Sequence, residues 1–237
     1  MCPRRQIIAL GGGGFSMEPD NPLLDDYVVA ATGKEQPRIC FIPTASGDSD
    51  NYVLRFYQAF AGRGCRATHL PLFQRKVADL RSLILQQDAV YIGGGNTANM
   101  LAVWRLHGLD VVLREAWDAG VVLAGISAGA LCWFEGGTTD SFGPTLVPLR
   151  DGLGLLAGSL CAHYDGEEQR RPLYRRCVAE GILPGGLAID DGCAVHFEGT
   201  EIGAIVSSRP TARAYRVERS DTGDCVVETP LDARFLG

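Results

Sequence analysis

The chain has 237 residues, of which 46% are hydrophobic and 21% are charged, a balance typical of a globular protein. This length suits one α/β domain spanning residues 1–237. The formal net charge is −6 and no block of like charges occurs, which argues against nucleic acids and anionic membranes as partners, because both bind to basic patches.

The cysteines and the first residues predict a cytoplasmic protein. The 8 cysteines include no C-x-x-C pair, so neither a zinc knuckle nor a secreted disulfide framework is expected. We expect buried, reduced thiols instead. The apolar run Ile7–Leu10 is too short for a signal peptide or a membrane span.

The first half of the sequence alternates between apolar strands and helices. We expect strands at Gln6–Leu10, Arg38–Ile42, Thr68–Phe73, Asp88–Ile92 and Val121–Ile126. We expect helices at Asn21–Ala31, Asn51–Gly62, Val77–Gln87, Asn99–Leu106 and Leu109–Ala119. Uniformly apolar strands separated by helices predict a parallel sheet flanked by helices on both faces. Ligands bind such sheets beyond the carboxyl ends of the strands, where Gly11–Gly14, Gly93–Gly95 and Ser127 fall.

After Ser127 the pattern changes. We expect a helix at Ala128–Glu135, a loop at 136–144, a short strand at Leu160–His163 and a charged helix at Glu167–Glu180. The remaining short runs predict antiparallel strands appended to the parallel sheet. These runs are Gly186–Ile189, Ala194–Phe197, Glu201–Val206, Ala214–Val217 and Cys225–Glu228.

The segment Gly125-Ile-Ser127-Ala-Gly129 is a G-x-S-x-G sequence between an expected strand and an expected helix. In this context a serine projects its hydroxyl above the sheet from a tight turn, and the glycines avoid a clash. The N–H of Ala128 can point at a developing oxyanion, aided by the positive end of the helix. Ser127 is therefore the predicted nucleophile, and the alternative is a glycine-rich turn with an incidental serine.

A second glycine-rich turn is Gly93-Gly-Gly-Asn-Thr97. Three glycines after a strand let the backbone approach a ligand closely. The alternative is a phosphate-binding loop, but no Gly-Lys-Ser/Thr follows and no G-x-G-x-x-G pattern is completed. A second oxyanion donor, complementing Ala128, fits better.

A serine nucleophile needs a base, and His163 follows a short strand at the expected active edge. The other three histidines, His69, His107 and His196, are more naturally structural. The base needs an orienting acid. The candidates are Glu135, Asp140, Asp165 and the pair Asp190–Asp191, and the sequence pattern alone does not decide among them.

In order and with similar separations, Gly93–Thr97, Ser127–Ala130, Thr138–Asp140 and His163 resemble peptidase E, the aspartyl dipeptidase family, and its relative cyanophycinase. The resemblance extends from about residue 5 to about residue 200. It implies a parallel sheet between helices like that of class I glutamine amidotransferases, with serine in place of cysteine. It does not imply the α/β-hydrolase fold.

The resemblance also implies roles for individual residues. It places the orienting acid at Asp191, before Gly192, where the family has a glutamate. Asp140 resembles another acid that affects activity in the family, and it is the second choice. The oxyanion loop of the family corresponds to Gly94 and Gly95, beside Ala128.

Substrate binding departs from the family pattern at one position. Peptidase E holds the substrate's aspartate with an arginine after the histidine, and Glu167 stands at that position here. Arg170 or Arg171 can substitute, because a guanidinium binds both carboxylate oxygens. We expect Asn96 and Arg170 to contact the substrate.

The resemblance therefore implies a serine peptidase that cleaves dipeptides or short peptides with an amino-terminal aspartate through an acyl-enzyme on Ser127. Neither a metal nor an organic cofactor is expected, and a homodimer is left open. The alternatives are a cyanophycinase-like or other small-amide hydrolase, a catalytically inactive binding protein and a nucleotide-binding protein.

Overall fold

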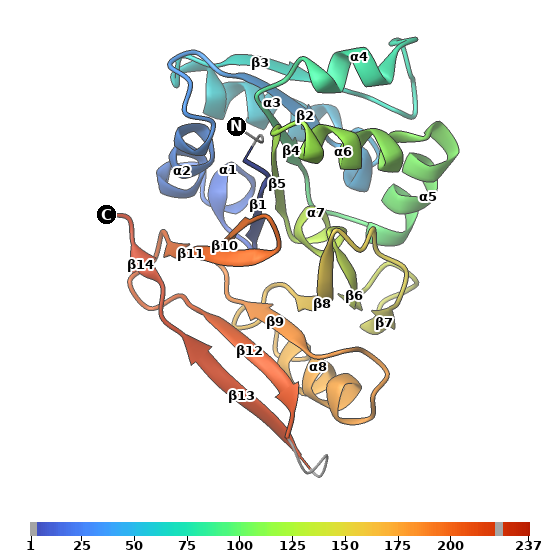
Figure 1. The fold of residues 1–237 in the computed structure, drawn as a ribbon, viewed down its shortest axis with the longest axis vertical. Coiled ribbons are helices and arrows are strands. Elements are labelled where there is room, and N and C mark those ends of the chain that lie inside the picture. The colour runs from blue at the N-terminus through green and yellow to red at the C-terminus, as the bar shows by residue number, and fades with distance from the viewer. Residues whose placement is uncertain (1–3, 221–224) are drawn as a thin grey trace.

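The computed structural model describes residues 4–220 and 225–237, which form two β-sheets surrounded by helices (Figure 1). The first sheet has eight strands in the order β14-β11-β10-β1-β5-β4-β2-β3. They are β1 (Gln6–Leu10), β2 (Arg38–Ile42), β3 (Arg66–His69), β4 (Ala89–Ile92), β5 (Val122–Ile126), β10 (Cys193–Glu198), β11 (Glu201–Ser207) and β14 (Arg234–Phe235). Strands β1 to β5 are mutually parallel, and β1, β4 and β5 are buried at every residue, as strands covered on both faces must be.

Helices cover both faces of this sheet. On one face, α2 (Leu23–Ala31) and α3 (Asp50–Ala61) pack against alternate strand residues such as Ile8. On the other face, α4 (Leu80–Leu85), α5 (Thr97–His107) and α6 (Leu109–Asp118) pack against residues such as Ile7. The prediction of a parallel sheet flanked by helices on both faces is therefore confirmed.

The appended strands differ from the prediction, because most of them form a second sheet. Its order is β13-β12-β9-β8-β6-β7, and its strands are β6 (Phe134–Thr139), β7 (Val147–Leu149), β8 (Leu156–Cys161), β9 (Gly186–Ile189), β12 (Ala214–Arg219) and β13 (Val226–Leu231). Strands β6, β8 and β9 are parallel, so the antiparallel prediction for Gly186–Ile189 holds only for its pairing with β12. Strands β10 and β11 do extend the first sheet, with β10 antiparallel to β1 and β11 antiparallel to β10.

The predicted helix Ala128–Glu135 is wrong beyond its first turn. Helix α7 (Ala128–Leu131) is short, and β6 begins at Phe134 and runs through the first four residues of the predicted loop at 136–144. The paired glycines of β6 explain the error, because a Cβ on Gly137 would lie 2.1 Å from the carbonyl oxygen of Leu160. Two strands that approach this closely require glycine at the contact. In the sequence, the same glycines were interpreted as loop residues.

Several boundaries also move for local reasons. Helix α4 begins at Leu80 because the Asp79 side chain accepts a hydrogen bond from the N–H of Ser82. Strand β3 ends at His69, before Pro71. Strand β8 ends at Cys161 rather than at His163, and helix α8 is confined to Arg170–Ala179.

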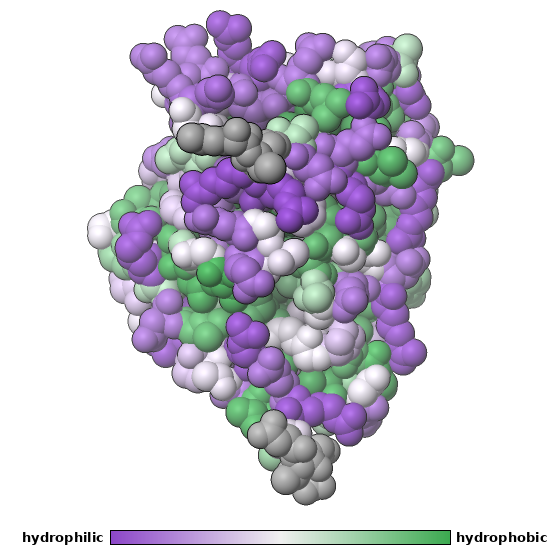
Figure 2. Space-filling model, in the orientation of Figure 1, coloured by the Kyte–Doolittle hydropathy of each residue, from purple (hydrophilic) through white to green (hydrophobic). Residues whose placement is uncertain are grey.

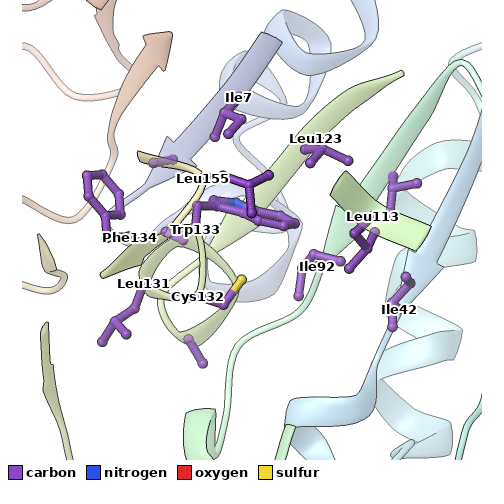
Figure 3. Close-up of a cluster of buried hydrophobic side chains, with 14 of the residues drawn as sticks. Ile7, Ile42, Ile92, Leu113, Leu123, Leu131, Cys132, Trp133, Phe134 and Leu155 are labelled. Carbon is purple, nitrogen blue, oxygen red and sulfur yellow. The ribbon is translucent and has the colours of Figure 1, made fainter. Parts of the chain in front are cut away.

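The buried side chains join the two sheets. The largest cluster includes Ile7 and Leu123 from the first sheet and Phe134 and Leu160 from the second. Figure 3 shows the ring of Trp133 near Ile7, Leu123 and Leu155, and the Trp133 side chain is fully buried. The segment that follows Ser127 is thereby anchored in the shared core.

On the outer surface, polar and apolar residues are interspersed over the face seen in Figure 2. Within residues 4–220 and 225–237, no helix has the length and apolar character needed to cross a membrane. Seven cysteines lie in this range and all are unpaired. Five are buried as predicted, but Cys65 is partly exposed and Cys225 is exposed, while Cys2 lies outside the described residues.

Candidate active site

Ser127 occupies a strained turn between β5 and α7. Its φ and ψ are 56° and −112°, in a region that residues with side chains rarely adopt. The turn fits only because its flanking residues are glycines: a Cβ on Gly125 would lie 2.0 Å from the Gly129 carbonyl oxygen. The Ser127 N–H donates to the Leu10 carbonyl at 3.0 Å, which fixes the turn against the end of β1.

His163 follows β8 and reaches Ser127 from the second sheet. Its φ of 53° lies in the left-handed region, and its N–H donates to the Gly11 carbonyl at 3.2 Å. The imidazole Nε2 lies 2.8 Å from Ser127 Oγ, and Nδ1 lies 2.6 Å from Asp191 Oδ1. With its proton on Nδ1, the ring donates to Asp191 and accepts from the serine hydroxyl, the arrangement of a general base.

Asp191 sits in a recess that glycines create. A Cβ on Gly12 would lie 1.8 Å from Asp191 Oδ1, and a Cβ on Gly166 would lie 2.4 Å from Oδ2. The Asp191 N–H donates to Asp165 Oδ1 at 2.8 Å. Sequence reasoning assigned no specific role to Gly12, although the four-glycine run after β1 was a usable signal that a neighbour approaches the backbone there.

The other acids considered for His163 lie elsewhere. Asp165 holds the Asp191 backbone rather than the imidazole. Asp190 turns toward the N–H of Arg213, and burial raises the pKa of its carboxyl to about 6. Glu135 accepts a hydrogen bond from the N–H of Gly158. Asp140 lines the pocket beside Ser127 without contacting the histidine.

The other three histidines have structural partners. His69 is hydrogen-bonded to Tyr57 and His107 lies near Arg75. His196 bridges the side chains of Tyr27 and Gln6, and burial lowers the pKa of its imidazole.

The predicted oxyanion donors are not equivalent. The Gly94 N–H donates to the Tyr52 hydroxyl at 3.2 Å, so this amide already has an acceptor. Gly95 and Ala128 both line the pocket of Ser127. Gly95 has a φ of 137°, and a Cβ there would lie 2.2 Å from the Ala45 carbonyl oxygen. The geometry therefore favours Gly95 and Ala128 over Gly94, whose neighbour Tyr52 sequence reasoning missed.

The pocket beside Ser127 is narrow and polar. Its other lining residues are Gly95, Thr97, Ala128, Leu131, Thr138, Thr139, Asp140, Ala162 and Arg170. It encloses free space of about 10 Å³, the room of one water molecule. A bound substrate group would therefore contact these side chains directly.

Arg170 supplies the positive charge of this pocket. The residue is 5% exposed, and its guanidinium donates to both carboxylate oxygens of Glu167 and to the Thr138 carbonyl. Glu167, the departure noted in the sequence, thus fixes the arginine in place. Arg171 instead pairs with Glu228, away from the pocket lining.

The prediction that Asn96 binds substrate is not supported by its contacts. Its side-chain oxygen accepts from the N–H of Asn99 and caps α5, while its amide donates to the Ser141 carbonyl. Both polar ends are therefore engaged in holding the loop after β6. Among the residues that the structure describes, no group of three or more His, Cys, Asp or Glu side chains is arranged to hold a metal ion.

Comparison with known proteins finds a matching family and related chains. The family described as Peptidase family S51 matches residues 7–205. Uncharacterized peptidase YgaJ of Bacillus subtilis (strain 168) is 54% identical over 233 residues, which are 98% of this chain and 100% of the relative. Peptidase E of Streptomyces coelicolor is 28% identical over 190 residues, 76% of this chain and 74% of the relative. The crystal structure of a peptidase from an acI-B1 Actinobacterium has a TM-score of 0.70 at 19% identity, covering 98% of this chain and 95% of the other.

Proposed function

The chain belongs to peptidase family S51 and is a peptidase, and from this premise we propose that it is a serine peptidase acting on dipeptides or short peptides with an amino-terminal aspartate. The observation that carries the proposal is the continuous hydrogen-bonded series from Ser127 through His163 to Asp191. The family membership agrees with the resemblance drawn from the sequence motifs.

In the proposed reaction, Ser127 Oγ attacks the peptide carbonyl while His163 Nε2 accepts its proton. Asp191 keeps the imidazole in the required tautomer and stabilises the imidazolium. The amides of Ala128 and Gly95 stabilise the oxyanion. The imidazolium then protonates the leaving amine, and water, activated by the same histidine, hydrolyses the acyl-enzyme.

Arg170 supports the assignment of aspartate as the substrate's first residue. It is the cation of the pocket, and a guanidinium fixed by Glu167 and Thr138 is pre-organised to bind a second carboxylate. The charge of Glu167 weakens this attraction, so Arg170 would select a carboxylate less strongly than an unpaired arginine.

The proposal also includes the domain organisation and the cellular location of the protein. The cluster of buried residues shared by the two sheets supports a single catalytic domain over the whole chain. The seven unpaired cysteines of the described residues favour a cytoplasmic location.

The test is hydrolysis of dipeptides that start with Asp, Glu, Asn or Ala, together with labelling by a fluorophosphonate. We expect selective cleavage of the Asp peptides and one labelled serine. In Ser127→Ala, labelling should be lost and kcat should fall by about 10⁴-fold or more. Ser49→Ala, which changes a serine outside the pocket, is the matched control and should retain both.

Other outcomes separate the parts of the proposal. Cleavage without preference for Asp would keep the serine mechanism and remove the substrate assignment. Preference for branched aspartyl–arginine substrates would indicate a cyanophycinase-like activity. Absence of both hydrolysis and labelling in the wild type would contradict a serine peptidase.

A further inference from the structure

Asp140 is the one acidic residue in the lining of the pocket of Ser127, and it is exposed to solvent. Nearby carboxylates are engaged: Asp191 with His163, Asp165 with the Asp191 N–H, and Glu167 with Arg170. In contrast, the carboxylate of Asp140 has neither a hydrogen bond nor an ion pair within residues 4–220 and 225–237. A pocket that contains a free carboxylate is ready to accept a cation.

The backbone beside Asp140 is nonetheless held firmly. The next residue, Ser141, accepts a hydrogen bond from the Asn96 amide at 2.9 Å through its carbonyl. Its hydroxyl accepts from the N–H of Ala98 at 3.2 Å and is bonded to the Thr139 hydroxyl at 2.7 Å. These bonds fasten the end of β6 to the first turn of α5. The free carboxylate is therefore presented from a fixed position rather than from a loose loop.

The charges of the pocket match those of an amino-terminal aspartyl residue. Such a residue carries a carboxylate on its side chain and an ammonium group on the carbon next to the carbonyl that Ser127 would attack. Arg170 is suited to the first charge, and Asp140 is left for the second. We propose that Asp140 binds the α-ammonium group of the substrate and so favours substrates with a free amino terminus. This inference rests on the proposed function, because it concerns the same pocket.

The expected preference has a measurable size. An ammonium–carboxylate pair is a charge-assisted hydrogen bond, roughly twice as strong as a neutral one. Asp140 is exposed, so solvent screening reduces its contribution. We therefore expect a preference of about 10- to 100-fold for ligands with the ammonium group over ligands without it.

The test measures binding so that it does not depend on catalysis. In the Ser127→Ala background, calorimetry compares an aspartyl dipeptide with its succinyl counterpart, which lacks only the α-ammonium group. The aspartyl ligand should bind about 10- to 100-fold more tightly. In Ser127→Ala/Asp140→Asn this ratio should approach one. Ser127→Ala/Glu168→Gln, which removes an exposed acid outside the pocket lining, should retain the ratio.

The inference would be overturned by an equal ratio in the Asp140 and parent proteins, by no preference in the parent, or by no binding of either ligand. Hydrolysis by the wild type is measured separately. A protein that shows the Asp140-dependent ratio but cleaves no peptide would contradict the proposed function and uphold the ammonium site.

Discussion

The half of the molecule built around the first sheet and the half built around the second sheet each contain a carboxyl side chain with little exposure to solvent. The pKa values of these two carboxyl groups are shifted in opposite directions. Asp25, on α2 beside the first sheet, is 1% exposed, and burial raises the pKa of its carboxyl to about 7 despite the nearby Arg63. Glu228, on β13 of the second sheet, has a side chain that is 7% exposed. Burial acts to raise the pKa of Glu228, but hydrogen bonds from Tyr164 and two arginines outweigh it and lower the pKa.

This difference reflects how each half is built. The first sheet is held by apolar strands and helices, where a charge finds few partners. The second sheet also buries apolar side chains, but it includes polar contacts such as the Ser159–Tyr174 pair and the Glu228 cluster beside α8. Replacement of Asp25 should therefore act through desolvation, and replacement of Glu228 through charge.

The candidate site lies where the two halves meet. An added methyl group at that junction should therefore have the largest effect on catalytic activity. In Gly12→Ala the new Cβ would lie 1.8 Å from Asp191 Oδ1 and 2.9 Å from His163 Nδ1. The carboxylate and imidazole must move apart, and displacement of catalytic groups by about 1 Å costs on the order of 10²-fold in rate. We expect kcat/KM to fall by about 10²- to 10³-fold, measured on the best aspartyl dipeptide.

Gly62→Ala is the matched control, because a Cβ at Gly62 meets no atom within 4 Å and its φ of −85° suits alanine. It should leave kcat/KM unaltered. Full activity in Gly12→Ala would show that the two halves adjust to each other, and the idea of a rigid junction would be wrong.

At the same junction, the sequence predicted the features that depend on neighbouring residues but not the contacts between residues that are distant in the chain. The bounds of β1 and β2 match the prediction, since an apolar run and its turn residues lie next to each other in the chain. The turn at Ser127 has the same advantage. The position of His163 beside it depends instead on a hydrogen bond to Gly11, a residue far away in the sequence.

Features that depend on distant partners were missed or misassigned. The Gly94 amide was a predicted oxyanion donor, but the hydroxyl of Tyr52 accepts its hydrogen bond. Gly137 suggested a loop, although close approach by Leu160 is what requires glycine there. In both cases the residue type was informative and the partner that explains it was not visible in a local pattern.

Asp25→Asn should have the next largest effect, on stability. The folded protein binds the Asp25 proton more tightly than the unfolded chain, since the pKa rises from 3.8 to about 7. The free energy of unfolding therefore falls as pH rises through this window. Asparagine removes the charge, so the variant should be more stable than wild type by on the order of 3 kcal/mol at pH 8 and show little gain at pH 4.

Urea denaturation at the two pH values measures this difference. Asp20→Asn, at an exposed site, is the control and should change stability by less than about 0.5 kcal/mol at either pH. A stability loss in Asp25→Asn at pH 8 would mean that the carboxylate is well solvated or paired, and the contrast with Glu228 would fail.

Glu228→Gln should have a smaller effect of opposite sign. A lowered pKa means that the carboxylate stabilises the fold above its unfolded value of 4.5 and loses this contribution as pH falls through the folded pKa. Glutamine deprives Arg171 and Arg175 of their anionic partner, but both are partly exposed, so we expect a loss of about 1 to 2 kcal/mol at pH 7. The loss should shrink toward pH 3, whereas the exposed control Glu201→Gln should show neither loss nor trend. An equal loss at both pH values would assign Glu228 to packing rather than charge, because the shape of the side chain is the same at every pH.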